Sequence, residues 1–121
     1  MEFGKKTTIK GAPAIVGSYS GGNIIQQTMV ANDVTGLEPG HVVVIESGVI
    51  KTRWDGTKAT IPKWALAIVT TKQFEGDNSV STLRFGTYIR DRVLLEDDIA
   101  LDASSEFYMS LHYLYAEGSW L

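Results

Sequence analysis

Residues 54–95 read WDGTKATIPKWALAIVTTKQFEGDNSVSTLRFGTYIRDRVLL, and this stretch decides the fold. The dipeptide Asp55-Gly56 predicts a tight turn, because glycine takes the positive φ that such turns require. Residues 64–71 form an apolar run, which predicts a strand that is covered on both faces. Residues 79–85 alternate in polarity, as half-buried strands do. The stretch therefore predicts two strands joined by a turn and preceded by a hairpin.

Similar signals continue toward the N-terminus. Residues 41–46 and 49–54 are rich in β-branched side chains and are separated by Ser47-Gly48, a pattern typical of two strands and a break. Within the stretch quoted above, residues 57–61 predict a strand that returns from the Asp55-Gly56 turn and ends at Pro62. Residues 24–34 fit either a strand or a short helix. Short strands about ten residues apart predict a mainly β, barrel-like domain.

The C-terminal part follows a different pattern and predicts one short helix. Asp102 or Ser104 can cap it, and Glu106 lies in its first turn, where a carboxylate is favourable. Gly118 is a natural stop, after which Trp120 and Leu121 form a short apolar tail expected to fold back. Four apolar residues recur at helical spacing, as in an amphipathic helix: Phe107, Leu111, Leu114 and Tyr115.

Residues 1–23 are interpreted as a flexible N-terminal arm, and residues 24–121 as the β-rich domain. The arm is rich in Gly, Ser and Thr, and its few apolar side chains bury too little surface to offset the entropy of ordering. Residues 7–10 and 14–16 nevertheless favour strand, so the arm could add a strand to a partner's sheet. An ordinary frayed terminus is the alternative.

Composition limits the classes of protein that fit. A chain of 121 residues with 44% hydrophobic and 21% charged residues is expected to be a single globular domain without a membrane span or secretory leader. Its net charge of −3 argues against general nucleic-acid binding, and the absence of cysteine excludes disulfides and thiolate sites. Residues 1–32 carry three lysines against one glutamate, whereas the remainder is acidic. A slightly basic arm could seek an acidic surface.

Residues able to carry chemistry are few. His41 and His112 have no Asp or Glu at metal-ligand spacing, no Gly-x-Ser-x-Gly elbow is present, and the glycine-rich residues 17–22 lack the Lys-Ser/Thr of a P-loop. Residues 96–98 are three adjacent carboxylates, which suit a solvated turn better than a calcium loop. We therefore expect no enzyme activity, no cofactor and no metal. Trp54 and Trp64 could form a sugar-stacking platform, but core or subunit packing is favoured.

The order of turns and strands resembles the head decoration (cement) proteins of lambda-type tailed phages. The likeness covers residues 36–121 and is clearest from residue 49 to residue 95. It is carried by Leu37-Glu38-Pro39-Gly40, Trp54-Asp55-Gly56-Thr57, the apolar strand 65–69, Ser81-Thr82-Leu83, and Gly86-Thr87-Tyr88 leading to Val93-Leu94. Two departures are the expanded acidic turn at residues 74–78 and the aromatic C-terminal tail.

The resemblance implies a β-clip domain that forms a homotrimer and binds the major capsid protein at three-fold positions of the expanded head. The protein would be made in the host cytoplasm and would sit on the outer surface of the virion, without binding nucleic acid or membrane. Expected capsid-binding residues of the arm are Lys5, Lys6, Thr7, Thr8, Ile9, Lys10, Ile15 and Val16. Expected trimer or core-packing residues are Trp54, Trp64, Phe85 and Tyr88.

Two other classes of function fit the same sequence. One is a carbohydrate- or surface-binding β module of a phage tail or a secreted protein, which exposed tryptophans would favour. The other is a small hydrolase, which would need a cleft joining His41 or His112 to a carboxylate and a nucleophilic serine.

Overall fold

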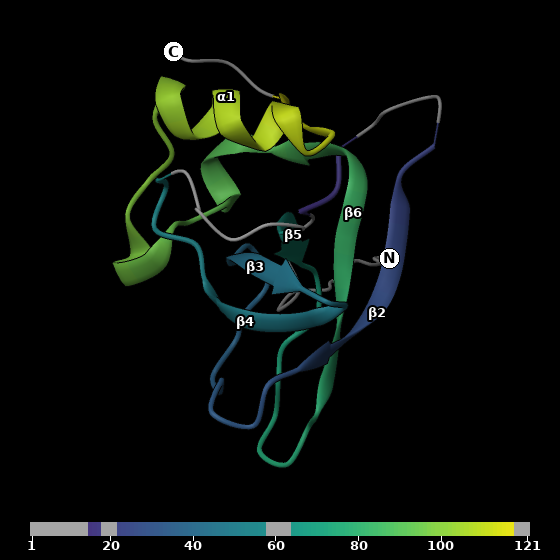
Figure 1. Ribbon diagram of the computed structural model, residues 1–121. Helices are drawn as coiled ribbons and strands as arrows, with labels where there is room; N and C mark the ends of the chain where they lie inside the picture. The colour runs from purple at the N-terminus through teal and green to yellow at the C-terminus, as the bar shows by residue number, and fades with distance from the viewer. Residues whose placement is uncertain (1–14, 18–21, 58–63, 118–121) are drawn as a thin grey trace, which may run out of the picture.

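Five strands form a closed barrel in the computed structural model, which describes residues 15–17, 22–57 and 64–117 (Figure 1). The strand order is β2-β4-β3-β5-β6, and β6 pairs back onto β2 to close the ring. The mainly β, barrel-like fold with one short helix is thus confirmed. The strands are β2 (Ile24–Val30), β3 (Val42–Glu46), β4 (Val49–Arg53), β5 (Trp64–Val69) and β6 (Ser79–Ile89).

The ambiguous segment after residue 23 is a strand because it closes the barrel. β2 pairs antiparallel with β6 and, through Met29 and Val30, parallel with β4. β3 and β4 form a hairpin around Ser47 and Gly48, both of which have positive φ, as a two-residue hairpin turn requires. The expected return strand at residues 57–61 falls almost wholly outside the described residues.

The strand side chains form two apolar layers. All five strands contribute to the first, which therefore fills the barrel; it includes Val30, Val43, Ile45, Ile50, Ala67, Val69 and Val80. The second lies on the outer face of β3, β5 and β6 and includes Val42, Val44, Leu66, Ile68 and Leu83. Because successive strand residues point to opposite faces, β3 and β5 are buried on both sides. This confirms the expectation for the apolar run that begins at Trp64.

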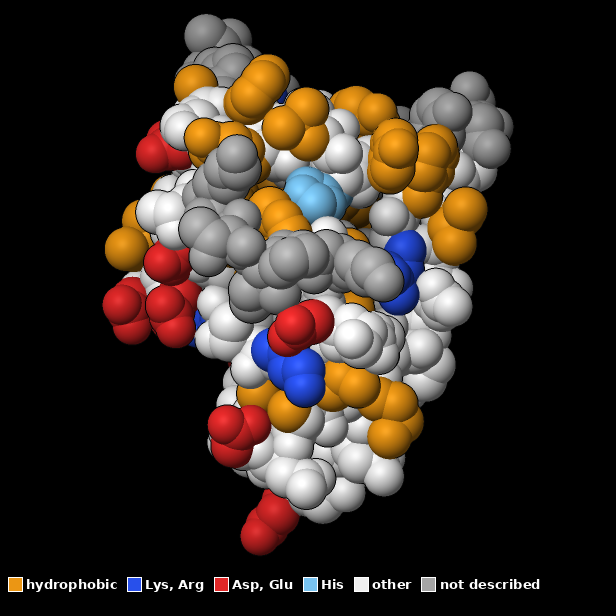
Figure 2. All heavy atoms as spheres, viewed as in Figure 1, with side chains coloured by type: hydrophobic (Ala, Val, Ile, Leu, Met, Phe, Trp, Pro, Cys, Tyr) orange, Lys and Arg blue, Asp and Glu red, His pale blue; other side chains and the backbone are white. Residues whose placement is uncertain are grey.

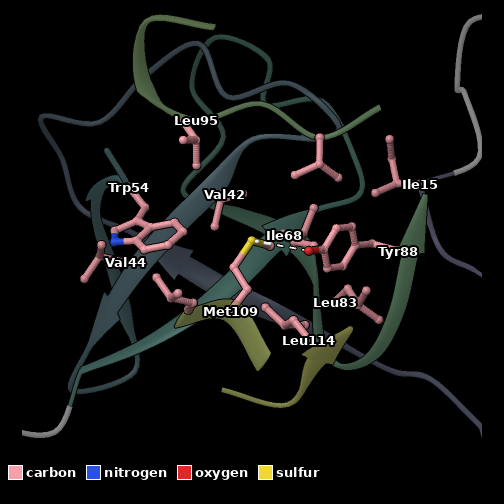
Figure 3. Packing of buried hydrophobic residues seen from close by; sticks show 12 residues of the cluster. Ile15, Val42, Val44, Trp54, Ile68, Leu83, Tyr88, Leu95, Met109 and Leu114 are labelled. Atoms are coloured by element: carbon pink, nitrogen blue, oxygen red, sulfur yellow. Dashed lines mark hydrogen bonds between the residues drawn. The ribbon is translucent and has the colours of Figure 1, made fainter. Parts of the chain in front are cut away.

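The outer layer is covered by the chain that follows β6. This cover consists of two 3-10 turns, η1 (Arg90–Arg92) and η2 (Glu96–Asp98), then α1 (Ala103–Leu111) and β7 (Leu114–Glu117). β7 pairs in parallel with the end of β6, and Met109 of α1 is buried completely in the outer layer (Figure 3). Trp54, Tyr88, Val93 and Leu95 complete the layer.

The helix is shorter than its sequence pattern predicted. Asp102 is the N-cap, as expected, and exchanges hydrogen bonds with Ser105 in a capping box. However, α1 ends at Leu111, and Tyr113 takes a positive φ of 70° that turns the chain into β7. Leu114 and Tyr115 are therefore strand residues and not part of the helix, Leu114 is buried, and Phe107, Leu111 and Tyr115 are exposed.

The boundary expected at residue 23 also needs correction. Ile15 is buried in the outer layer, and its carbonyl accepts a 2.8 Å hydrogen bond from the Ile89 amide. Val16 forms an antiparallel bridge with Tyr88, and the Gly17 amide donates to the Thr87 carbonyl at 2.8 Å. Residues 15–17 thus flank the end of β6 and belong to the folded domain. Residues 1–14 lie outside the described residues.

None of the helices in the described ranges combines the length and the apolar character that a membrane crossing needs.

Candidate interaction surfaces

Of the eight expected capsid-binding residues, only two lie in the described part of the chain. Lys5, Lys6, Thr7, Thr8, Ile9 and Lys10 all lie outside the described residues. Ile15 and Val16, which were expected to fill pockets on a capsid, instead pack on the chain's own barrel. A β-carbon on Gly17 would overlap the Thr87 and Glu117 side chains, so the segment lies very close to both β6 and β7. Ile15 is buried in the domain and Val16 is partly buried against it.

Two of the four expected aromatic contacts are core residues. Trp54 is buried, and its indole Nε1 donates a 2.6 Å hydrogen bond to the Thr57 carbonyl, which anchors the turn at Gly56. Tyr88 is completely buried, and its hydroxyl donates to the Met109 sulfur at 3.6 Å. Burial raises the pKa of this hydroxyl, because the phenolate would be poorly solvated there. Neither Trp54 nor Tyr88 is available for a subunit contact.

The other two aromatic residues are half-buried. Trp64 packs against the His112 ring, with a centroid separation of 4.4 Å and an interplanar angle of 54°. Phe85 stacks on Tyr113 at 5.9 Å. A sugar platform built from Trp54 and Trp64 is therefore wrong, since the first is inside the protein and the second is packed against a histidine.

His41 belongs to a small charged cluster where β3 begins. Its Nδ1 accepts a 3.1 Å hydrogen bond from the Glu38 amide, so the neutral ring carries its proton on Nε2. Nε2 lies 3.9 Å from the Asp98 carboxylate, which Arg53 also binds at 3.1 Å. Burial lowers the pKa of His41, and the nearby Arg53 guanidinium lowers it further, against the opposing effects of Asp98 and Glu38.

This cluster holds the segment after β6 against the barrel. Besides binding Asp98, Arg53 donates a 2.7 Å hydrogen bond to the Leu95 carbonyl. The turn at residues 96–98 is exposed, as expected, and the described residues contain no group of His, Asp and Glu side chains that could hold a metal ion. His41 does not have the geometry of a general base, because a backbone amide occupies its Nδ1 lone pair.

A shallow hollow of about 240 Å³ lies at the end of the barrel far from α1, between the loops at residues 31–35 and 73–78. Gln73 is its buried polar residue. The Gln73 amide nitrogen donates to the Val34 and Asp77 carbonyls, and its oxygen accepts from the Leu37 amide. The hydrogen-bonding groups of Gln73 therefore serve the loops and leave little for a ligand.

The opposite end of the molecule exposes apolar side chains that the sequence pattern did not identify as a surface. Figure 2 shows hydrophobic side chains gathered along the upper edge, over α1 and toward the upper end of β2. The members that are about half exposed or more are Ile24, Phe107, Leu111, Tyr113 and Tyr115, here called the apolar face. The signal that could have revealed it was the spacing of Phe107 and Leu111 about Met109, since only one side of a short helix can face the core.

Compared with known proteins, the sequence matches no family model, and no curated protein matches it.

Proposed function

We propose that this chain is a head decoration protein of a tailed phage, which trimerises and binds the outer surface of the expanded capsid. The observation that carries the proposal is the succession of turns and strands from residue 49 to residue 95, which resembles that of lambda-type decoration proteins. Its role would be to stabilise the shell against the pressure of packed DNA.

Two features of the domain support a structural role. The chain builds a small closed barrel whose outer face is sealed by η1, η2, α1 and β7, a rigid body suited to repeated display. The hollow at the end of the barrel far from α1 is lined by loops whose buried amide, that of Gln73, is already satisfied. We therefore assign binding to the surface and to the N-terminal segment rather than to this hollow.

The basic N-terminal segment is the proposed capsid contact. Lys5, Lys6 and Lys10 stand against one glutamate in a protein that is otherwise acidic, which favours encounter with an acidic shell. Since residues 15–17 already pair with β6, a contact with the capsid would begin before them. Three such segments on one trimer would raise the effective concentration of the second and third once the first has bound.

The proposal is tested by co-sedimentation with expanded, undecorated heads assembled from the candidate phage's own major capsid protein. Deleting residues 1–12 spares Ile15 and should leave a folded domain that no longer sediments with heads. The triple variant K5E/K6E/K10E should bind more weakly and lose most of its salt dependence. K51E, which changes an exposed lysine of β4, is the control and should bind almost normally. Undiminished binding by the deletion would refute the proposed contact, and failure of the full chain to bind heads would refute the function.

A further inference from the structure

We infer that the apolar face is the surface through which copies of this chain associate. The inference rests on the homotrimer of the proposed function, for which it names the contact residues. The face lies on α1, on β7 with the turn before it, and at the start of β2, whereas the basic segment is at the N-terminus.

Two side chains of α1 belong to the apolar face, because they lie on the side of the helix that does not pack on the core. Ser105 and Met109 are the buried residues of α1. Side chains two positions away along a helix point about 200° around the axis, so Phe107 and Leu111 face outward while Met109 faces the core. They are four residues apart and therefore adjacent on the surface, and they are 60% and 57% exposed.

The turn and strand after the helix extend the same surface. Leu114 is completely buried, so its strand neighbour Tyr115 projects to the opposite side of β7, and Tyr113, in the turn before the strand, is 59% exposed. The Tyr113 ring stacks on Phe85, and Phe85 is the register partner of Ile24 on β2. These contacts link Tyr113 across β6 to the start of β2, at the end of the molecule where α1 also lies (Figure 1).

The size of the face fits a protein contact. Five residues that are about half exposed, three of them aromatic, present on the order of 500 Å² of apolar surface. This lies in the upper range for the largest patch on a monomer and approaches the roughly 800 Å² that each partner contributes to a standard interface. Contact with the neighbouring rim would supply the remainder.

The chemistry of the face favours a second copy over a charged partner. None of its five members is charged, so it offers nothing to recognise an anionic or cationic surface. A contact made by uncharged side chains adds no repulsion between copies of a chain whose net charge is −3. In a three-fold ring each copy meets its neighbour through two different parts of its surface, so the apolar face of one copy would pack on another part of the next copy, where the tyrosine hydroxyls can both donate and accept hydrogen bonds.

The test is the oligomeric state of the full chain, measured by light scattering and sedimentation over a range of concentrations. In the variant F107E each copy carries a new charge on the face, and the concentration for half-dissociation should rise at least about thirtyfold. F74E is the matched control, because Phe74 is 64% exposed on the loop at the other end of the barrel. Circular dichroism and thermal unfolding should show that both variants remain folded.

The outcomes separate this inference from the proposed function. An oligomer that F107E dissociates and F74E does not supports the apolar face as the contact. An oligomer that survives F107E, with head binding intact, overturns the face and leaves the decoration function standing. A wild-type chain that stays monomeric at high concentration overturns the inference. If a chain ending at Glu117 then self-associates, residues 118–121 cover the face; otherwise a different protein is its partner.

Discussion

The Tyr88 hydroxyl donates a hydrogen bond to the Met109 sulfur, and both side chains are completely buried (Figure 3). Tyr88 comes from β6 and Met109 from α1, so this contact joins the barrel to the helix that seals its outer layer. A thioether is a weak acceptor, so packing supplies most of the stabilisation here and the hydrogen bond orients the ring.

Replacing Met109 with alanine should therefore destabilise the protein far more than removing the Tyr88 hydroxyl. We expect M109A to cost about 2–5 kcal/mol of unfolding free energy, because it leaves a cavity beneath α1. Y88F should cost about 0.5–1 kcal/mol, since it removes one weak hydrogen bond. Chemical denaturation of the two variants measures both values. Equal losses would mean that α1 is not packed through Met109.

Tyr88 should also make the protein sensitive to alkali. Burial raises its pKa in the folded state above the unfolded value of 10.0, so the neutral phenol is the form that folding favours. The corresponding stability is complete below pH 10 and is lost as the pH rises above it. Between pH 9 and pH 11 the wild type should lose unfolding free energy faster than Y88F. Parallel pH profiles for the two proteins would contradict this.

His41 should make the protein less stable in mild acid. Its pKa is lowered below 6.5 in the folded state, chiefly by burial and then by Arg53, so folding favours the neutral ring. The stability that this contributes is present above pH 6.5 and falls as the pH drops through the folded pKa. In H41N the amide oxygen can replace Nδ1 as acceptor for the Glu38 amide without titrating.

The loss of unfolding free energy between pH 7.5 and pH 5 should therefore be smaller in H41N than in the wild type. Burial also lowers the pKa of His112, so H112N serves as the comparison that separates the two histidines. Denaturant titrations at each pH give the free energies, and NMR titration of the ring Cε1 protons gives the pKa of each residue. A His41 pKa at or above 6.5 would contradict the prediction.

Gly40 should tolerate replacement by alanine less well than Gly48. Its φ is 98°, and a β-carbon would overlap the Arg92 carbonyl oxygen. G40A should cost at least about 3 kcal/mol, because it adds a backbone clash to the strain of the left-handed region. Gly48, with φ 82° and open space around it, is the control. G48A should cost only about 1–2 kcal/mol, and similar losses in both would show that the contact with Arg92 does not matter.

Ile15 tests where the folded domain begins. Because it is 3% exposed and packs in the outer layer, I15A should cost about 2–4 kcal/mol. I99A, which removes an isoleucine that is 57% exposed and does not belong to the apolar face, should change the unfolding free energy by less than about 0.5 kcal/mol. Hydrogen exchange should also protect the Gly17 and Ile89 amides. If I15A left the unfolding free energy unchanged, Ile15 would belong to the free arm that the sequence predicted and not to the folded domain.

The sequence pattern predicted the strands well where the constraint is local. Ser47-Gly48 and Asp55-Gly56 define turns because of backbone sterics, and the apolar run after Trp64 can be satisfied only by burial on both faces. The same reasoning found the cap at Asp102, since the capping bond forms within four residues. It could not decide between strand and helix for residues 24–34, because β2 depends on pairing with β6, more than fifty residues away.

The errors came from contacts that are distant in the sequence. Ile15 sits in a glycine-rich segment with little apolar content, and only the free edge at the end of β6 gives it a place in the core. Phe107, Leu111, Leu114 and Tyr115 share one helical spacing, yet the chain turns at Tyr113 because Leu114 pairs with β6. The helical spacing of these four residues therefore did not identify the buried side of the helix, because α1 ends at Leu111 and the last two residues belong to β7.

By itself the sequence determined that this chain is a small, cysteine-free, mainly β domain with a basic start, because composition, turn residues and alternation act over a few residues at a time. Only the tertiary structure decided which strand closes the barrel, where the N-terminal segment joins the core and which aromatic side chains remain outside. Those features depend on burial and on backbone pairing between distant segments, and both are properties of the whole packed chain.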